Sequence, residues 1–204
     1  MPEQSPKCAH PALKYSTSIR TDRLLIRSIE ESDADGVFGI RSFKEVYIWT
    51  TAGQWPDPAA AKAWISSQFS DPLTYRFVVE LLPSSSSSSD PTPTRNPLVG
   101  MLGTRGTPPN EIGYSFHPGF WKRGYASEAF SAFLPLFAET LSLEYVEAVT
   151  DEENVGSRAL LSKLGFEVVE RKDFEHVSLG RRVNTVMRVG KERIGCRSER
   201  QSLM

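Results

Sequence analysis

Cysteine and histidine are scarce in this chain, and their positions exclude two classes of site. The two cysteines, Cys8 and Cys196, lie near the ends and outside every periodic segment. They cannot form a disulfide framework, and the three histidines have no metal-ligand spacing. We therefore expect no bound metal and a reducing compartment, with the cytoplasm as the default location.

The chain also lacks a charge excess and long apolar runs. Its net charge is -1 and its pI is near 6.3, whereas a dedicated nucleic-acid binder usually carries a clear basic excess. No apolar run approaches the length of about 18 residues that a membrane span requires. The first 20 residues have no apolar core of a secretory signal. We expect neither nucleic acid nor membrane as a partner.

The periodic segments indicate one α+β core, for which 204 residues with 39% hydrophobic content suffice. Alternating or apolar runs predict seven strands, and helical spacing predicts four helices, in the order β-α-α-β-β-β-α-β-α-β-β. We expect one domain over residues 18–190, preceded by a flexible leader over 1–17 and followed by a charged flexible tail over 191–204. The predicted strands are 23–29, 75–82, 98–103, 111–116, 145–150, 166–170 and 183–189, and the predicted helices begin near 32, 57, 122 and 154.

Residues 83–97 (PSSSSSSDPTPTRNP) form a low-complexity segment that can bury almost nothing. Its ordering entropy cannot be offset by burial, so the composition predicts a flexible loop. A domain linker is the rival interpretation. We favour an overgrown hairpin loop because a strand resumes directly after the segment.

The chain is organised around residues 117–141, where an apolar strand leads through a basic turn into a long helical pattern. Lys122, Arg123 and Gly124 occupy the turn. The first N–H groups of a helix have no internal partner and the helix dipole is positive there, so such a turn suits a phosphate. A tight turn with two solvated basic side chains is the alternative. Pro135 lies inside the pattern and predicts a kink or a division of the helix.

Three strings together resemble the GNAT superfamily of acyl-CoA-dependent N-acetyltransferases. They are TDRLLIR near the start, IGYSFHPGFWKRGYASEA in the middle and NVGSRALLSKLGF near the end. The closer match is the branch of the bacterial ribosomal-protein alanine acetyltransferases. The resemblance implies a mixed fold, with a mostly antiparallel sheet of about seven strands flanked by about four helices. It also implies acetyl-CoA as the acyl donor and CoA as the product.

The resemblance further implies a binding path for CoA. The strands 111–116 and 145–150 would splay apart, and backbone groups near Phe116 and His117 would bond the pantetheine arm. Histidine is a common general base, but the place of His117 at the turn favours a CoA contact or a structural role over that of a base. The pyrophosphate would lie on the backbone N–H groups of the turn, with basic side chains reaching the 3′-phosphate; these residues are Lys122, Arg123, Gly124, Tyr125, Ala126 and Ser127.

The chain departs from the family pattern at three positions. Trp121 stands where relatives usually carry Gln or Arg, Lys122 where many have Gly, and Leu161 where a Tyr often protonates the departing thiolate. In relatives without that Tyr, a serine is thought to protonate the thiolate instead, and the matching residue here is Ser157. An ordinary place in the first turn of a helix is the alternative role for Ser157.

Two further residues are candidates for the chemistry. Asn154 is a good helix N-cap and would also contact CoA or order the cleft, provided that different atoms do each. Glu111 is the best-placed carboxylate for a general base, since some relatives keep a Glu there. A solvated residue at the start of a strand is the alternative for Glu111.

These residues predict an N-acetyltransferase that transfers acetyl directly, in a ternary complex, to a primary amine. The amine would belong to a protein N-terminus or a small molecule, and the protein would be a monomer or homodimer. The aromatic segment 43–55 and the connection 172–182 with His176 would form the two lips over the acceptor, unless the former is only a hydrophobic cluster. An acyl-CoA-binding regulatory protein on the same fold is the alternative. A kinase or NTPase is disfavoured because the turn lacks the phosphate-loop motif.

Overall fold

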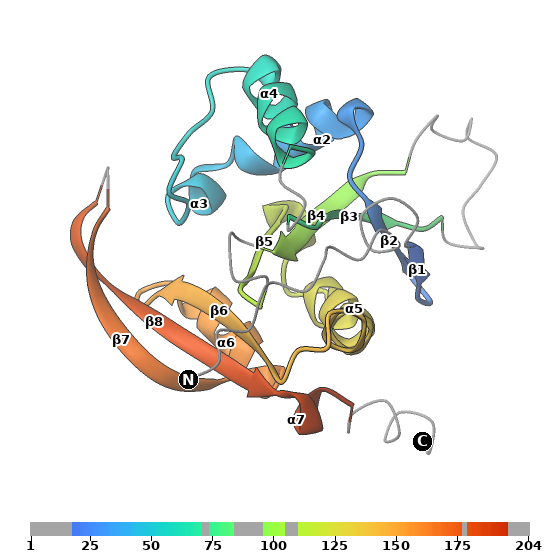
Figure 1. The fold of residues 1–204 in the computed structure, drawn as a ribbon. Helices are drawn as coiled ribbons and strands as arrows, with labels where there is room; N and C mark the ends of the chain where they lie inside the picture. The colour runs from blue at the N-terminus through green and yellow to red at the C-terminus, as the bar shows by residue number, and fades with distance from the viewer. Residues whose placement is uncertain (1–17, 71–73, 84–95, 105–109, 177–178, 196–204) are drawn as a thin grey trace.

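The computed structural model describes residues 18–70, 74–83, 96–104, 110–176 and 179–195. These ranges contain eight strands and six α-helices (Figure 1). The strands are β1 (Ser18–Arg20), β2 (Leu24–Ser28), β3 (Arg76–Leu81), β4 (Leu98–Thr104), β5 (Ile112–Phe116), β6 (Tyr145–Asp151), β7 (Glu167–His176) and β8 (Gly180–Gly190). The helices are α2 (Ala34–Arg41), α3 (Lys44–Tyr47), α4 (Pro58–Gln68), α5 (Tyr125–Thr140), α6 (Val155–Lys163) and α7 (Lys191–Gly195), with short 3-10 turns at Glu31–Asp33 and Pro118–Phe120.

The strands form two antiparallel sheets, ordered β1-β2-β3-β4-β5 and β6-β8-β7. The predicted mixed fold with mostly antiparallel strands is thereby confirmed. The described residues add β1, α3 and α7 to the seven strands and four helices expected. Each of the three additions has only three to five residues, which is too short to show a period in the sequence.

Helices cover both faces of the five-stranded sheet (Figure 1). On one face, α5 packs its phenylalanines against alternate residues of β2 and β3, for example Phe133 against Phe77. On the other face, α2 and α4 bury a smaller cluster with Val78 and Met101, which point the opposite way from their neighbours in the strands. The aliphatic side chains of β6 and α6, including Leu161, extend the first core into the second sheet.

The segment that was predicted to be a hairpin loop joins two neighbouring strands. β3 and β4 pair antiparallel, and the Leu81 N–H donates to the Pro97 carbonyl at 3.0 Å. Residues 84–95 of that loop, the leader over 1–17 and the end of the tail over 196–204 lie outside the described residues.

The prediction of a flexible tail from residue 191 onward is wrong for the first five residues of that tail. Lys191–Gly195 form α7 directly after β8. Ile194 packs against the main core, and this contact holds the helix in place despite its charged composition. A single apolar residue among charges gives no periodic signal, so the sequence did not indicate it.

The long central helix begins three residues later than predicted. Lys122 and Gly124 have φ values of 60° and 83°, which a right-handed helix cannot accommodate, and α5 therefore starts at Tyr125. Of the two outcomes predicted for Pro135, a kink or a division, the division is wrong, because α5 runs as one helix from Tyr125 to Thr140. The kink stays a prediction. On either side of the proline, Leu134 and Phe137 are buried in the core and hold the two halves together.

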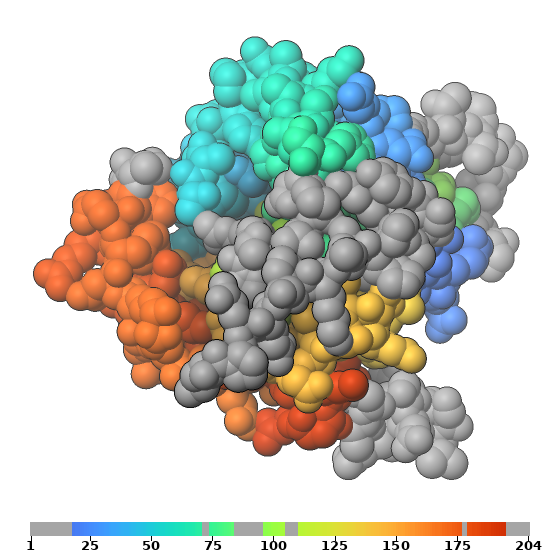
Figure 2. Space-filling view, viewed as in Figure 1, coloured from blue at the N-terminus to red at the C-terminus, as the bar shows by residue number. Residues whose placement is uncertain are grey.

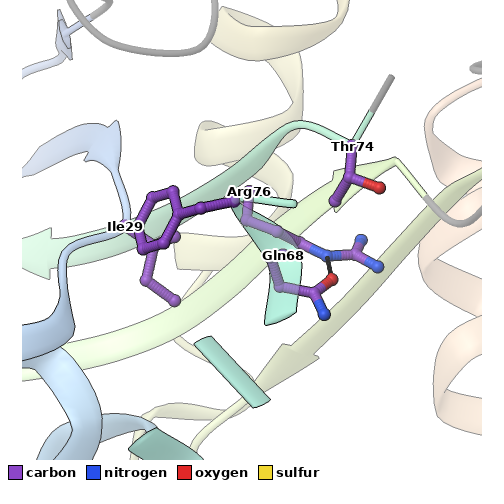
Figure 3. A pocket seen from close by; sticks show the side chains of 5 residues that line it. Ile29, Gln68, Thr74 and Arg76 are labelled. Atoms are coloured by element: carbon purple, nitrogen blue, oxygen red, sulfur yellow. Dashed lines mark hydrogen bonds between the residues drawn. The ribbon is translucent and has the colours of Figure 1, made fainter. Parts of the chain in front are cut away.

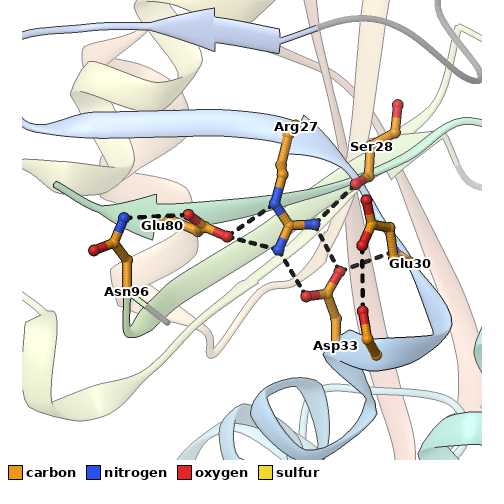
Figure 4. Close-up of polar contacts among 7 residues, drawn as sticks. Arg27, Ser28, Glu30, Asp33, Glu80 and Asn96 are labelled. Carbon is orange, nitrogen blue, oxygen red and sulfur yellow. Dashed lines mark hydrogen bonds and ion pairs between the residues drawn. The ribbon is translucent and has the colours of Figure 1, made fainter. Parts of the chain in front are cut away.

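An ion-pair network joins β2, β3 and the entry to α2 on the sheet (Figure 4). The Arg27 guanidinium donates to both Asp33 carboxylate oxygens at 2.7 and 2.8 Å, and its Nε donates to Glu80 at 2.8 Å. Asp33 and Glu80 are 3% and 8% exposed, so Arg27 neutralises two carboxylates that water scarcely reaches. Those bonds raise the pKa of the Arg27 guanidinium further above its ordinary value, which keeps it charged.

Replacing Arg27 by Met should destabilise the fold strongly, because it removes the cation that pairs with two buried carboxylates. We expect Arg27→Met to lower the free energy of unfolding by about 3–5 kcal/mol, measured by urea denaturation. Arg20→Met, at an exposed position of β1, is the matched control and should change it by less than about 0.5 kcal/mol. Equal effects of the two variants would contradict this role of the network.

Candidate functional site

Two neighbouring strands part at the centre of the molecule. β5 and β6 run parallel and share one bridge among the described residues, Glu111 with Glu147, where the Glu147 N–H donates to the Asn110 carbonyl at 2.8 Å. Beyond it β5 stays in the first sheet and β6 in the second. We call this divergence, from residue 112 to 116 and from 148 to 151, the splay. It confirms the expectation that these strands separate.

The splay leaves backbone groups of β5 without a neighbouring strand, but not all the groups that were expected. The His117 N–H donates to the Val99 carbonyl at 2.9 Å, and the His117 carbonyl accepts from Phe120 N–H at 2.9 Å. Hydrogen bonds alternate along an antiparallel strand, so the groups of Tyr114 and Phe116 face away from β4. The Phe116 carbonyl accepts from Trp121 Nε1 at 2.7 Å, which leaves its N–H facing the splay.

β4 uses the His117 N–H, and the 3-10 turn uses one lone pair of the His117 carbonyl. Only the second lone pair of that carbonyl remains for the predicted backbone contact with a ligand. The His117 side chain is also engaged: Nδ1 accepts from the Gly119 N–H at 3.0 Å, and the ring packs edge-on against Phe43 and Phe120. The His117 side chain therefore stabilises the start of the turn.

The turn after β5 presents a row of backbone donors. The left-handed conformations of Lys122 and Gly124 curve the backbone, and the first bond of α5 runs from Glu128 N–H to the Gly124 carbonyl at 3.0 Å. No described residue accepts a hydrogen bond from the backbone N–H groups of the turn, which belong to Lys122, Arg123, Gly124, Tyr125, Ala126 and Ser127. Consecutive free N–H groups at left-handed residues and a helix N-terminus form an anion-binding concavity.

The structure adds Arg23 to this turn, a residue that sequence reasoning missed. The Arg23 Nη1 donates to the Arg123 carbonyl at 3.1 Å, and a Cβ added to Gly124 would lie 3.4 Å from Arg23 Nη2. Its guanidinium also lies 4.6 Å from the centre of the Tyr125 ring. Arg23 is 100 residues from the turn and no local pattern links the two; only its place in the TDRLLIR string offered a signal.

Glu128, in the first turn of α5, fixes Arg23 in this position. Its carboxylate accepts from Arg23 Nε at 2.7 Å, from the Arg23 N–H at 3.2 Å and from Thr21 Oγ1 at 2.5 Å. Burial alone would raise the pKa of the Glu128 carboxyl, but the bonds from Thr21 and Arg23 prevail and lower it. The start of β2 and the start of α5 are thus tied together beside the row of donors.

Across the splay, α6 begins with two of the predicted residues. The Asn154 side-chain oxygen accepts from the Ser157 N–H at 3.1 Å, which confirms Asn154 as the N-cap and leaves only its Nδ2 for a ligand. The Ser157 hydroxyl lies 2.6 Å from the Tyr114 hydroxyl of β5. Burial raises the pKa of Tyr114 to about 12, against the opposing effect of the bond to Ser157.

Leu161, at the position where relatives often carry a tyrosine, is fully buried in the main core. The phenol that contacts the start of α6 comes from another element, because it belongs to Tyr114 of β5. The sequence places these residues 43 positions apart, so it gave no sign of their contact.

Glu111 and Ser157 approach the splay from opposite faces of the sheet. Ile112, Tyr114 and Phe116 point toward α5 and α6, and alternation along the strand turns Glu111 to the other face, which α2 covers. The structure thus brings Ser157 and Asn154 together at α6, whereas Glu111 lies apart at the bridge with Glu147.

The two predicted lips meet at the open end of the splay. Phe43 contacts the His117 ring at 4.6 Å between ring centres, and the Arg182 guanidinium lies 6.0 Å from the centre of the Trp49 ring. Arg182 also forms a bidentate ion pair with Asp151 at the end of β6, with N–O distances of 2.7 and 2.9 Å. Trp55 is buried in the second core, as the interpretation of segment 43–55 as a hydrophobic cluster requires. Phe43 is 37% exposed, and a role of this segment over the acceptor stays a prediction.

The connection 172–182 is not a loop but the end of the long β7–β8 hairpin, which stands beside α3 (Figure 1). Figure 2 shows the orange atoms of this hairpin next to the blue-green atoms of the α3–α4 region. His176, expected on the lip, is 7% exposed, so its ring cannot serve as a surface contact.

Two cavities lie away from the splay. One, between α4 and β3, has a volume of about 10 Å³ and is lined by Ile29, Gln68, Phe69, Thr74 and Arg76 (Figure 3). It has room for about one water molecule. The other is a shallow depression of about 210 Å³ at the C-terminal end of β8, around Val169, Arg188 and Gly190. Neither adjoins the row of free N–H groups.

Among the described residues, no helix combines the length and the apolar character that crossing a membrane would require.

Comparison with known proteins agrees with this geometry. The model of the acetyltransferase (GNAT) domain family matches residues 23–167. The uncharacterized N-acetyltransferase YoaA of Bacillus subtilis is 26% identical over 156 residues, covering 73% of this chain and 82% of YoaA.

Solved structures show the same fold. A putative ribosomal-protein-serine acetyltransferase from Vibrio cholerae superposes with a TM-score of 0.68 at 24% identity, covering 87% of this chain and 99% of the other. Mycobacterium smegmatis RimJ in complex with CoA-disulfide superposes with a TM-score of 0.63 at 19% identity, covering 84% of each chain.

The matching family model and the relatives named as N-acetyltransferases define the class of this protein, which is an acyltransferase. The chain belongs to the GNAT acetyltransferase family, and the resemblance seen in its three strings is confirmed.

Removing the charge of Glu128 should loosen the contact between β2 and the turn. We expect Glu128→Gln to lower the free energy of unfolding at pH 7 by about 1 kcal/mol, a value discounted because Arg23 is half exposed. The folded-state pKa of Glu128 lies below its ordinary value of 4.5, so the charged carboxylate stabilises the fold above that pH. The difference between wild type and variant should shrink as the pH falls below 4.5.

Thermal unfolding across pH 3–7 measures this difference. Glu139→Gln, at an exposed position of the same helix, is the control and should give a small difference at every pH. A Glu128→Gln effect that does not vary with pH would show that packing, rather than charge, accounts for it.

Proposed function

We propose that this acetyltransferase moves the acetyl group of acetyl-CoA to a primary amine by direct transfer in a ternary complex. The observation that carries the proposal is the row of six free backbone N–H groups directly after the splay. It offers a site for a pyrophosphate next to a strand edge that can bond an extended amide chain. Pantetheine diphosphate combines these two chemical features.

The residues present fit acetyl-CoA in this placement. The pyrophosphate would accept bonds from the N–H groups of 122–127, and the exposed side chains of Lys122 and Arg123 would add charge for the remaining phosphate. The Phe116 N–H would bond the pantetheine arm, and the Asn154 Nδ2 would be the second polar contact. Trp121, in place of the usual Gln or Arg, would fix the Phe116 carbonyl and so the edge of the strand.

The chemistry requires a neutral amine, a proton acceptor and stabilisation of the departing sulfur. The amine nitrogen attacks the thioester carbon, the C–S bond breaks, and its electron pair remains on sulfur. Glu111 would accept the amine proton on one face of the sheet, through water if the distance requires it. Ser157 would donate a hydrogen bond to the sulfur on the other face.

The acceptor would enter between the two lips, where aromatic rings and Arg182 gather. A protein N-terminus or a small amine fits this proposal, and the neighbours named ribosomal-protein acetyltransferases support the former. An α-amino group titrates near pH 8 and so needs only a modest base, whereas a lysine needs more help. We propose a cytoplasmic monomer or homodimer that acts without nucleic acid or membrane.

A tryptophan at position 124 should abolish binding of acetyl-CoA. Isothermal titration of the wild type with acetyl-CoA and with CoA should give micromolar dissociation constants, and Gly124→Trp should weaken both at least about 100-fold by filling the concavity. Gly39→Trp on α2 is the control, since a Cβ there meets no atom within 4 Å, and it should bind as the wild type does. Absence of heat with wild type would overturn the proposed function.

Acetyl transfer itself separates an enzyme from a regulatory CoA-binding protein. A panel of peptides with free N-terminal Ala or Ser and of small amines should include an acceptor for which CoA release follows acceptor concentration. Ser157→Ala should then lower kcat about 10- to 100-fold, and Glu111→Gln should shift the pH profile toward alkaline pH. CoA binding without transfer to any amine would favour the regulatory alternative.

A further inference from the structure

The partly buried phenol of Tyr114 contacts Ser157, the residue that the proposed function places next to the departing sulfur. The Tyr114 ring packs edge-on against Phe130 of α5, with ring centres 4.9 Å apart, and lies 6.4 Å from the Phe116 ring. These contacts fix the ring, so the hydroxyl can occupy only a narrow range of positions. It lies 2.6 Å from Ser157 Oγ and 3.4 Å from the Ser157 carbonyl oxygen.

The direction of this short hydrogen bond follows from the acidities of the two groups. A phenol is a much stronger acid than an aliphatic alcohol, so the phenol is the better donor and the alcohol the better acceptor. Burial also keeps Tyr114 protonated throughout the physiological range, because its pKa is raised to about 12. The favoured arrangement therefore has Tyr114 donating and Ser157 Oγ accepting.

This arrangement determines where the serine hydrogen points. A hydroxyl has one hydrogen and two lone pairs. If Ser157 Oγ accepts from Tyr114, its own hydrogen must point elsewhere. The Ser157 backbone is held as well, since its N–H donates to Asn154 Oδ1 at 3.1 Å. Both the backbone and one lone pair of Ser157 are thus fixed.

We propose that Tyr114 is a positioning residue that directs the Ser157 hydroxyl hydrogen toward the sulfur of CoA at the splay. The proposal rests on the function proposed above and adds a residue from β5 to it. The chain carries Leu161 where relatives often have a tyrosine. Here a phenol from β5 reaches the start of the same helix and acts through the serine.

The chemical step needs no net transfer from either hydroxyl. As the C–S bond breaks, its electron pair goes to sulfur, and Ser157 O–H donates a hydrogen bond to the forming thiolate. An aliphatic alcohol is a weaker acid than a thiol, so the serine keeps its proton. The proton lost by the attacking amine is released through its base and finally protonates either CoA or solvent.

The thiol pKa of bound CoA tests this arrangement without an acceptor. The ultraviolet absorbance of the thiolate, titrated with pH on the protein–CoA complex, should show a pKa below that of free CoA. Ser157→Ala should raise the thiol pKa by about one unit, the value expected for the loss of one hydrogen bond to a charged group. Tyr114→Phe should raise it by about half a unit or more, and the double variant no further than Ser157→Ala.

Tyr145→Phe is the matched control, because this tyrosine of β6 stacks on Arg188 and should leave the thiol pKa unchanged. Tyr114→Phe keeps every ring contact and is expected to fold, which thermal unfolding checks. If it proves too unstable to titrate, Tyr114→Leu must show the same increase.

The outcomes distinguish this inference from the function on which it rests. If CoA does not bind to the wild type, the proposed function fails and the inference with it. If CoA binds and Ser157→Ala raises the thiol pKa while Tyr114→Phe leaves it unchanged, the function stands and Tyr114 only fills space. Independent, additive effects of the two variants would also overturn the proposal.

Discussion

The organisation of this molecule depends on two parallel strands that stay together for only one bridge. Once β5 and β6 part beyond Glu111 and Glu147, their facing edges hold peptide groups that pair with no strand in the described part of the chain. Unsatisfied backbone groups are costly when buried, so an open strand edge calls for water or a ligand with amides of its own. Because the pairing of β5 with β6 is incomplete, their backbone N–H and C=O groups are available to bind a ligand.

The turn after β5 follows the same principle with a different kind of group. A helix start always has free N–H donors, but here two left-handed residues bring further donors to the same side. The turn does not hold itself in place; Arg23 and Glu128 connect it to the first long strand. Preorganised donors lose less entropy on binding than flexible ones, so this connection should contribute to affinity without touching the ligand.

Local features of the site could be predicted from the sequence. The Asn154 cap, the basic turn around Gly124 and the order of strands and helices depend on neighbouring residues, which sequence patterns record directly. The sequence could not show that β4 already uses the His117 N–H, because the edge toward which an N–H points depends on the register with β4. A run of residues contains no information on that register.

Contacts between distant residues could not be predicted. Arg23 with Glu128 and Tyr114 with Ser157 join positions 105 and 43 apart, and each pair meets only after the sheet and its helices have assembled. The short helices α3 and α7 were missed for a related reason, since packing against the core stabilises them rather than propensity. The sequence thus indicates the parts of the site, and the fold decides which of them touch.

The close approach of two residues on neighbouring strands has an evolutionary consequence. A Cβ added to Gly100 of β4 would lie 2.4 Å from the Phe116 ring, so that ring lies directly on the backbone of its neighbour. Phe116 is also the residue whose N–H faces the splay. Positions 100 and 116 should therefore covary among relatives. A larger residue at one position should be accompanied by a smaller residue at the other.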